Sequence, residues 1–178
     1  YYSLGFMTQH GEGVPVDIPK AINFYRQAAD LGDTSAMIAL GDIFADPKLD
    51  FYSIEEARKF YKKAYENGDS TAPVVLARTY NPFISGFQNP TRTEVSLEEK
   101  SENIKKAQDW YEKAIEEGNY DVLFEYAESF SMSGDFETGV KVALEGLDIL
   151  TKSNHPDTSI KAHLYSLLAY YYNIQGFG

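Results

Sequence analysis

Hydrophobic and polar positions alternate with a helical period in three related segments, which read KAINFYRQAADLG (20–32), EARKFYKKAYENG (56–68) and KAQDWYEKAIEEG (106–118). Small and aromatic residues recur in each at positions i, i+3, i+4 and i+7, which forms one apolar stripe on an α-helix. The stripes consist of Ala21, Phe24, Tyr25, Ala28; Ala57, Phe60, Tyr61, Ala64; and Ala107, Trp110, Tyr111, Ala114. A glycine ends each segment, at positions 32, 68 and 118, where a left-handed residue typically terminates a helix. The pattern predicts three helices with marked ends.

A second motif lies between these helices and consists of a large residue followed by a small one. Its copies are Leu4-Gly5, Leu40-Gly41, Leu76-Ala77, Tyr126-Ala127 and Leu168-Ala169, spaced by 36, 36, 50 and 42 residues. An aromatic follows the small member by three residues in four copies, as Phe44, Tyr80, Phe130 and Tyr172. We expect the small residue to let a paired helix approach closely, while the aromatic fills the remaining space. The sequence therefore predicts an all-α stack of antiparallel helix hairpins.

Helix starts agree with this prediction. Ser53 with Glu56, and Ser96 with Glu99, have the spacing of a capping box at a helix N-terminus. Pro19 fits a first helical turn, where its missing N–H costs no hydrogen bond.

The repeated unit resembles the Sel-like repeat (SLR). The resemblance rests on Leu4-Gly5, on Gly11-Glu12-Gly13-Val14 and on the segment from Lys20 to Gly32. The second copy has Asp46-Pro47-Lys48 in place of the G-x-G turn. The resemblance implies about three SLR units in residues 1–118, the first one truncated. Beyond residue 118 the pattern is similar to tetratricopeptide repeats, which implies a tetratricopeptide-like unit and a following helix in residues 119–178.

Both resemblances imply a right-handed α-solenoid that binds proteins or peptides and has no catalytic residues or cofactor of its own. The chain begins with Tyr1 in the middle of a hairpin, so we interpret it as one continuous solenoid fragment of a longer protein. An architectural array that spaces other domains or associates end to end is the alternative.

The step of 50 residues includes an insertion at 81–95, which contains two Asn-Pro pairs and a glycine. These residues forbid a continuous helix and predict a loop between paired helices. Phe83, Ile84 and Phe87 offer an apolar contact to a partner, or they fold back onto the helices.

Acidic residues are concentrated in the second half of the chain. The formal charge is -11, with no Lys or Arg between Lys113 and Lys141. Asp121, Glu125 and Glu128 have the spacing of three carboxylates on one helix face. They are our candidate site for a partner segment that contains Lys or Arg, the alternative being a solvated acidic face.

The family resemblance also implies which residues line the concave surface, because the first helix of each pair forms that surface. The positions two residues before and after each large anchor are Tyr2, Phe6, Ile38, Asp42, Val74, Arg78, Phe124, Glu128, Ser166 and Tyr170. Apolar side chains alternating with acids suit an extended or helical basic segment.

Several other functions are disfavoured by composition. The net negative charge repels nucleic acid phosphates and anionic lipid surfaces. The absence of Cys excludes disulfides and thiolate metal sites, and no His pair has the helical spacing of metal ligands. Because no run of about 18 apolar residues occurs, we expect no membrane insertion. The sequence indicates a soluble non-enzyme and leaves its compartment open between cytoplasm and export.

Overall fold

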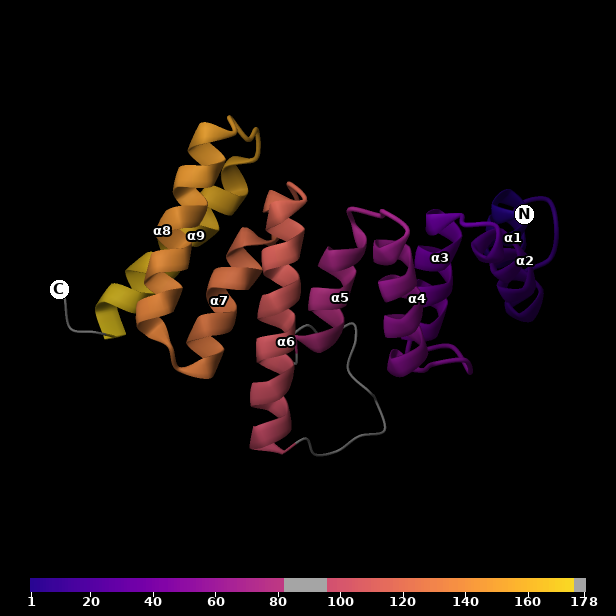
Figure 1. The fold of residues 1–178 in the computed structure, drawn as a ribbon, viewed down its shortest axis with the longest axis horizontal. Helices are drawn as coiled ribbons and strands as arrows, with labels where there is room; N and C mark the ends of the chain where they lie inside the picture. The colour runs from indigo at the N-terminus through magenta and orange to yellow at the C-terminus, as the bar shows by residue number, and fades with distance from the viewer. Residues whose placement is uncertain (82–95, 175–178) are drawn as a thin grey trace. The chain divides into compact units, whose positions relative to one another are not determined.

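The computed structural model describes residues 1–81 and 96–174. Within these residues the chain forms nine α-helices and one short 3₁₀ helix, without a β-strand (Figure 1). It divides into two compact units, Tyr1–Glu94 and Val95–Gly178, which we describe separately. Residues 82–95, which include most of the insertion with Phe83, Ile84 and Phe87, lie outside the described part.

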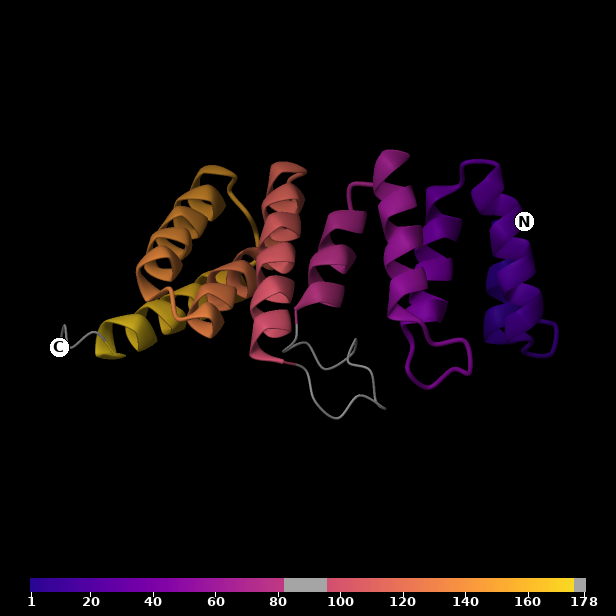
Figure 2. The same cartoon turned by 60° about the horizontal axis from the view of Figure 1, so that its bottom comes forward.

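The first unit contains helices α1 (Tyr2–His10), α2 (Ile18–Asp30), α3 (Thr34–Ala45), α4 (Ile54–Glu66) and α5 (Ala72–Tyr80). Each of them packs against the next one along the chain (Figure 2). The predicted stripes of α2 and α4 face this packing, because Ala21, Tyr25, Ala57 and Tyr61 are almost completely buried. Together with Leu40 they form the core, as the helical period predicts.

Close contact at the small residues confirms their expected role. A Cβ atom added to Gly41 would lie 2.3 Å from Cε1 of Tyr61, and one added to Gly5 would lie 2.7 Å from the ring of Tyr25. Both distances are shorter than a normal van der Waals contact, so the tyrosine of one helix occupies the space left by the glycine of its partner. Gly41 and Ala57 are both buried, as hairpin packing requires.

Helix ends follow the capping signals in the sequence. The side-chain oxygens of Ser53 and Ser96 accept hydrogen bonds from the backbone N–H groups of Glu56 and Glu99, at 3.3 and 3.1 Å. The backbone N–H of Ser53 donates to the carbonyl of Phe44 instead of to Glu56, so the first capping box forms only in one direction. The three glycines predicted to end helices all have positive φ, at Gly32, Gly68 and Gly118.

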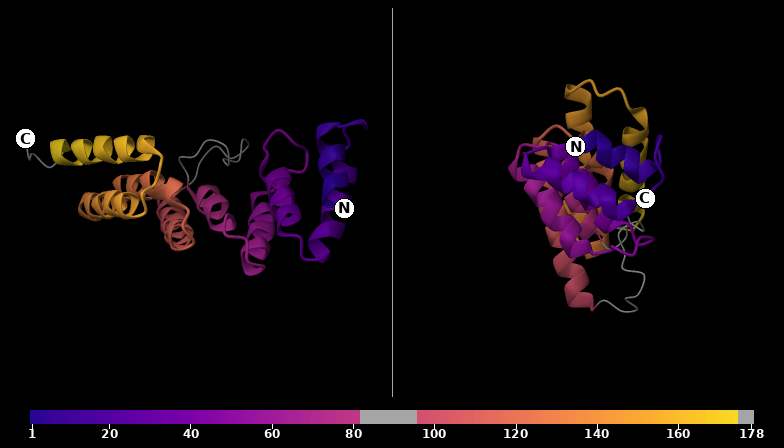
Figure 3. Two further views of the ribbon diagram at one scale, coloured as in Figure 1. Left: turned by 90° about the horizontal axis from the view of Figure 1, so that it is seen from above. Right: turned by 90° about the vertical axis from the view of Figure 1, so that its right-hand side faces the viewer.

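The second unit contains α6 (Leu97–Glu116), the 3₁₀ helix η1 (Tyr120–Val122), α7 (Leu123–Ser133), α8 (Phe136–Lys152) and α9 (Thr158–Ile174). Helix α7 packs against α6, α8 and α9, and α8 also packs against α9 (Figure 3). Leu123, Ala127, Leu150 and Leu164 lie in this core.

In α9 the large member of the second motif, Leu168, is buried as predicted, but the small and aromatic members are not. Ala169 is exposed and Tyr172 is 42% exposed, whereas Tyr171 is completely buried. The Tyr171 hydroxyl donates to the carbonyl oxygen of Ala127 at 2.7 Å, and a Cβ on Gly139 would lie 2.5 Å from this hydroxyl. The reason is that α9 packs against two helices, α7 and α8, which together select the side of the helix that carries Tyr171.

The first copy of the motif also differs from the others. Leu4 is 47% exposed, whereas Leu40 and Leu76 are fully buried. The expected change of repeat type after residue 118 concerns the sequence pattern and stays a prediction.

Candidate functional site

A groove between α7 and α9 brings together four of the predicted concave-surface residues. Its volume is about 470 Å³. Phe124 and Glu128 reach it from α7, and Ser166 and Tyr170 reach it from α9; the remaining lining residues are Ser131, Met132, His163 and Leu167. The rings of Phe124 and His163 lie 5.2 Å apart at one end. We call this surface the α7–α9 groove.

Glu128 is the acidic residue of the α7–α9 groove. It is half-buried and, within the part of the chain that the structure describes, its carboxylate forms neither a hydrogen bond nor an ion pair. Desolvation by burial, followed by repulsion from Glu125, raises its pKa above the ordinary value. The carboxylate therefore lacks the partner that a partly buried charge normally has.

The other two carboxylates of the predicted stripe have different surroundings. Glu125 accepts a hydrogen bond from the Tyr111 hydroxyl at 3.0 Å. Asp121 lies in η1 and not in α7, its side chain is 76% exposed, and its nearest ion-pair partner is Nε2 of His155 at 3.7 Å. The expected helical spacing of all three carboxylates therefore does not hold, because the 3₁₀ turn that buries Val122 precedes the α-helix.

A smaller groove in the first unit brings together three more predicted residues. Tyr2, Ile38 and Asp42 line a cavity of about 230 Å³ with Ser35, Ala39, Asp69 and Thr71. The Tyr61 hydroxyl donates to Oδ1 of Asp42 at 2.7 Å. Desolvation raises the pKa of the Asp42 carboxyl, and this hydrogen bond partly opposes the effect.

Three of the ten predicted concave-surface residues lie outside both grooves. Phe6 is exposed on α1, and its ring contacts that of His10 in a tilted arrangement with the ring centroids 4.4 Å apart. Val74 and Arg78 are half-buried on α5. Seven of the ten predicted concave positions thus line one of the two grooves, although the sequence did not indicate which of them share a cavity. Their role in partner binding stays a prediction.

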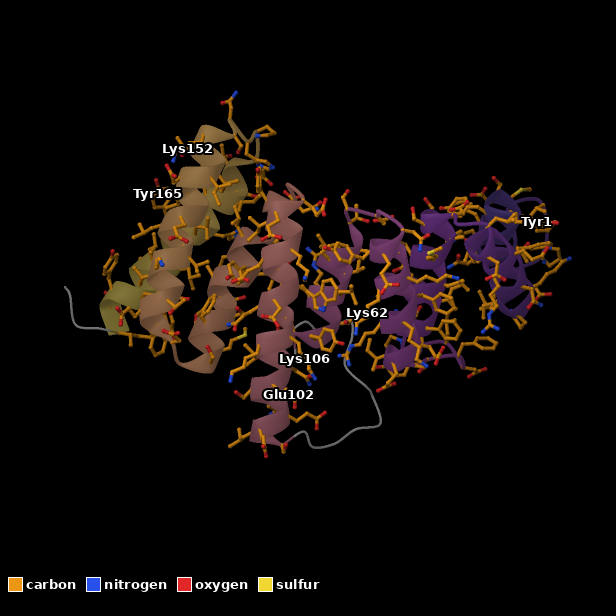
Figure 4. All side chains as sticks on the ribbon, viewed as in Figure 1. Tyr1, Lys62, Glu102, Lys106, Lys152 and Tyr165 are labelled. Atoms are coloured by element: carbon orange, nitrogen blue, oxygen red, sulfur yellow. The ribbon has the colours of Figure 1, made fainter. Side chains whose placement is uncertain are left out.

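No Lys or Arg that the structure describes lines the α7–α9 groove, and several lysines of the second unit pair with acids on their own helices. Lys106 lies 2.6 Å from Glu102 on α6, and Lys152 lies 2.5 Å from Asp148 on α8 (Figure 4). Each pair has i, i+4 spacing on the exposed surface, where it contributes little to stability.

Sequence reasoning missed four groove residues: Ser131, Met132, His163 and Leu167. They lie one helical turn from predicted positions, so their spacing from Glu128, Ser166 and Tyr170 could have identified them. No acidic or His residue follows His163 at i+4, so helical spacing alone does not single it out.

The rows of packed helix pairs and their grooves define an α-helical repeat protein. The family model "Sel1 repeat" matches residues 1–33, 34–69 and 98–119, which is about half of the chain. The chain belongs to the Sel1 repeat family.

Two solved structures are similar to this chain. The crystal structure of a Sel1 repeat protein from Oxalobacter formigenes has 22% sequence identity and a TM-score of 0.58, over 83% of this chain and 56% of the other. That of c5321, a protective antigen of uropathogenic Escherichia coli strains with an SLR fold, has 13% identity and a TM-score of 0.43, over 97% and 52%. This chain thus spans about half the length of these proteins. A search of the curated proteins finds no match.

The first of these similarities, together with the repeats, establishes the fold as an all-α solenoid of the SLR type. No helix among the described residues is both long enough and apolar enough to cross a membrane.

Proposed function

We propose that this chain is a protein-interaction module whose α7–α9 groove binds a partner segment that contains Lys or Arg. Sel1 repeats are generally protein–protein interaction modules and are typically non-enzymatic scaffolds. The observation that supports the finer proposal is Glu128, a half-buried carboxylate without a hydrogen-bond donor or cation in the described part of the chain. A cation supplied by a partner would restore the interactions that burial removes.

The shape of the groove supports a short segment with mixed chemistry. Its lining on α7 extends from Phe124 to Met132, which corresponds to about 12 Å along a helix axis. Apolar side chains lie at both ends, Phe124 at one and Met132 with Tyr170 at the other, and Glu128 lies between them. This order suits a segment with apolar residues on both sides of one basic residue.

The test uses two synthetic peptides, Ac-Ala-Leu-Ala-Arg-Ala-Leu-Ala-NH₂ and the same peptide with citrulline in place of Arg. Citrulline keeps the shape of Arg without its charge. The ¹³C-methyl signal of Met132 reports binding, since the chain has only three methionines and Met132 lies in the groove.

We expect the arginine peptide to shift the Met132 signal saturably and to bind at least fivefold more tightly than the citrulline peptide. Glu128→Gln should remove this preference, whereas Glu137→Gln, which changes the net charge equally at an exposed position of α8, should retain it. Equal affinity for both peptides, or no Met132 shift, would contradict the proposal.

Self-association is the second candidate function. It is favoured by exposed large apolar residues on the first and last helices, among them Leu4 on α1 and Tyr165 and Ile174 on α9. Light scattering over a range of concentrations measures it directly, because stacking of copies increases the mean mass without added ligand. A mass that stays constant would exclude this function for the fragment.

A further inference from the structure

A second groove lies between α6 and α8, and α7 forms its base. Its volume is about 280 Å³. The base and walls are apolar, because Leu123 and Val142 are buried there and Ile115 and Ile149 flank them. None of its lining residues belongs to the α7–α9 groove. We call it the α6–α8 groove.

Three glutamates lie around this apolar base: Glu112 and Glu116 on α6, and Glu145 on α8. The Tyr126 hydroxyl donates to Oε1 of Glu112 at 2.6 Å and fixes that carboxylate in place. Glu116 forms no ion pair or hydrogen bond with any residue that the structure describes. Among the described residues, the ion-pair partner of Glu145 is Lys141, which lies 3.9 Å away and whose side chain is 74% exposed. The three carboxylates therefore have no firmly held cation.

The pKa of Tyr126, at the base of the groove, also reflects the carboxylates around it. Burial raises the pKa of Tyr126, and the negative charges of Glu112, Glu145 and Asp109 raise it further. Carboxylates from α6 and α8 thus act on one hydroxyl. The surrounding sequence has no Lys or Arg between Lys113 and Lys141, so no cation of η1 or α7 neutralises them.

Only one class of side chain matches an apolar base with carboxylates around it. Lys and Arg pack their aliphatic stems on apolar surface while their charged ends stay at its margin. An apolar side chain would desolvate the glutamates without compensation, and an acidic one would be repelled. The volume is below the range of about 300–1,000 Å³ that is usual for small-molecule sites, so it suits a single side chain.

We propose that the α6–α8 groove is a second docking surface, which receives a Lys or Arg side chain of a partner protein between Glu116 and Glu145. Charge complementarity identifies this occupant. The second unit would then contact basic partners through two separate grooves, so that one long partner or two different partners could bind to it.

Titration with the same two peptides tests this surface independently, because the isoleucine methyl signals of Ile115 and Ile149 report it while Met132 reports the α7–α9 groove. We expect the arginine peptide to shift the signals of Ile115 and Ile149 saturably. The affinity obtained from these shifts should be at least threefold higher for the arginine peptide than for the citrulline peptide. The double variant Glu116→Gln/Glu145→Gln should lose this preference. Glu137→Gln, which removes one charge from an exposed position of α8 outside both grooves, is the control and should keep the preference for Arg at the two isoleucine signals.

The proposal is overturned if Ile115 and Ile149 do not shift at peptide concentrations up to 10 mM, or if both peptides shift them equally. It is also overturned if the double variant keeps the preference for Arg. Each of these outcomes is read without reference to Met132. A failure at the α7–α9 groove and a failure at the α6–α8 groove are therefore distinguishable in one experiment.

Discussion

Replacing Gly41 by alanine tests whether the glycine–tyrosine contact holds α3 and α4 together. In an exposed helix the change would stabilise by about 1 kcal/mol, because alanine has the higher helix propensity. Here the new Cβ would lie 2.3, 2.5 and 2.8 Å from three ring atoms of Tyr61, which is fully buried. Overpacking of this kind typically costs about 1–3 kcal/mol.

The ring has no inexpensive way to avoid the new methyl group. If it stays, the overlap costs about 3 kcal/mol, at the upper end of that range. If it moves, its hydroxyl leaves Asp42, and a hydrogen bond to a charged group contributes about 1.5–3 kcal/mol. After the gain in helix propensity, either route leaves a net destabilisation of about 2 kcal/mol.

Native-state hydrogen exchange of the α3 and α4 backbone amides measures this change within the first unit. A loss of about 2 kcal/mol corresponds to exchange that is about 30-fold faster. In a Tyr61→Leu background the same glycine substitution should cost much less, because the overlapping ring atoms are gone. Unchanged or slower exchange in Gly41→Ala, or an equal cost in both backgrounds, would refute ring overlap as the cause.

The remaining predictions concern substitutions at single positions. Gly146→Ala should stabilise the second unit by about 0.5–1 kcal/mol, because the new Cβ would meet carbon atoms no closer than 3.4 Å. Gly139→Ala should destabilise the second unit, because the new Cβ would lie 2.5 Å from the Tyr171 hydroxyl. Urea unfolding followed by Trp110 fluorescence measures both changes. Glu128→Gln should stabilise the second unit at pH 7, because the charged carboxylate is partly buried. This gain in stability should shrink as the pH falls through the raised pKa of Glu128 towards the ordinary value of 4.5, because the native state of the unchanged protein takes up the proton before the unfolded state does. A gain that is independent of pH in the same assay would contradict this prediction. The Arg58 guanidinium donates to Oγ1 and to the carbonyl oxygen of Thr79, at 3.2 and 2.5 Å, and lies over the ring of Tyr80. Lysine cannot make all three contacts at once, so Arg58→Lys should cost about 1–2 kcal/mol of stability in thermal unfolding. Ser53→Ala should cost about 1 kcal/mol by the same measurement through loss of the α4 N-cap, and an unchanged midpoint would show that the cap is dispensable.

Helix positions and most of the packing could be predicted from the sequence because they depend on local periodicity. The stripe from Ala57 to Ala64, the caps at Ser53 and Ser96, and the left-handed glycines each depend on a few neighbouring residues. In α9 the local pattern is ambiguous, since Leu167, Leu168, Tyr171 and Tyr172 offer two adjacent apolar sides. Contact with α7 and α8 selects between them, and periodicity contains no information about that contact.

The grooves were predictable to different extents. Repeat spacing placed Phe124, Glu128, Ser166 and Tyr170 at equivalent positions of two helices, but only the packing of α7 against α9 shows that they share a groove. The 3₁₀ turn at Asp121 was not predictable, because its residues also fit the first turn of an α-helix. The α6–α8 groove combines residues from three helices between positions 112 and 149, and no sequence motif connects Glu116 with Glu145.

The buried tyrosines have one further consequence. Tyr25 donates its hydroxyl hydrogen to the neutral amide oxygen of Gln9 at 2.8 Å, whereas Tyr61 donates to the anionic Asp42. The same phenol thus accommodates either an uncharged or a charged acceptor, with little change in the interior of the hairpin. Exchange of a single acceptor residue could therefore alter which ligands a repeat attracts, while the architecture that supports it is preserved.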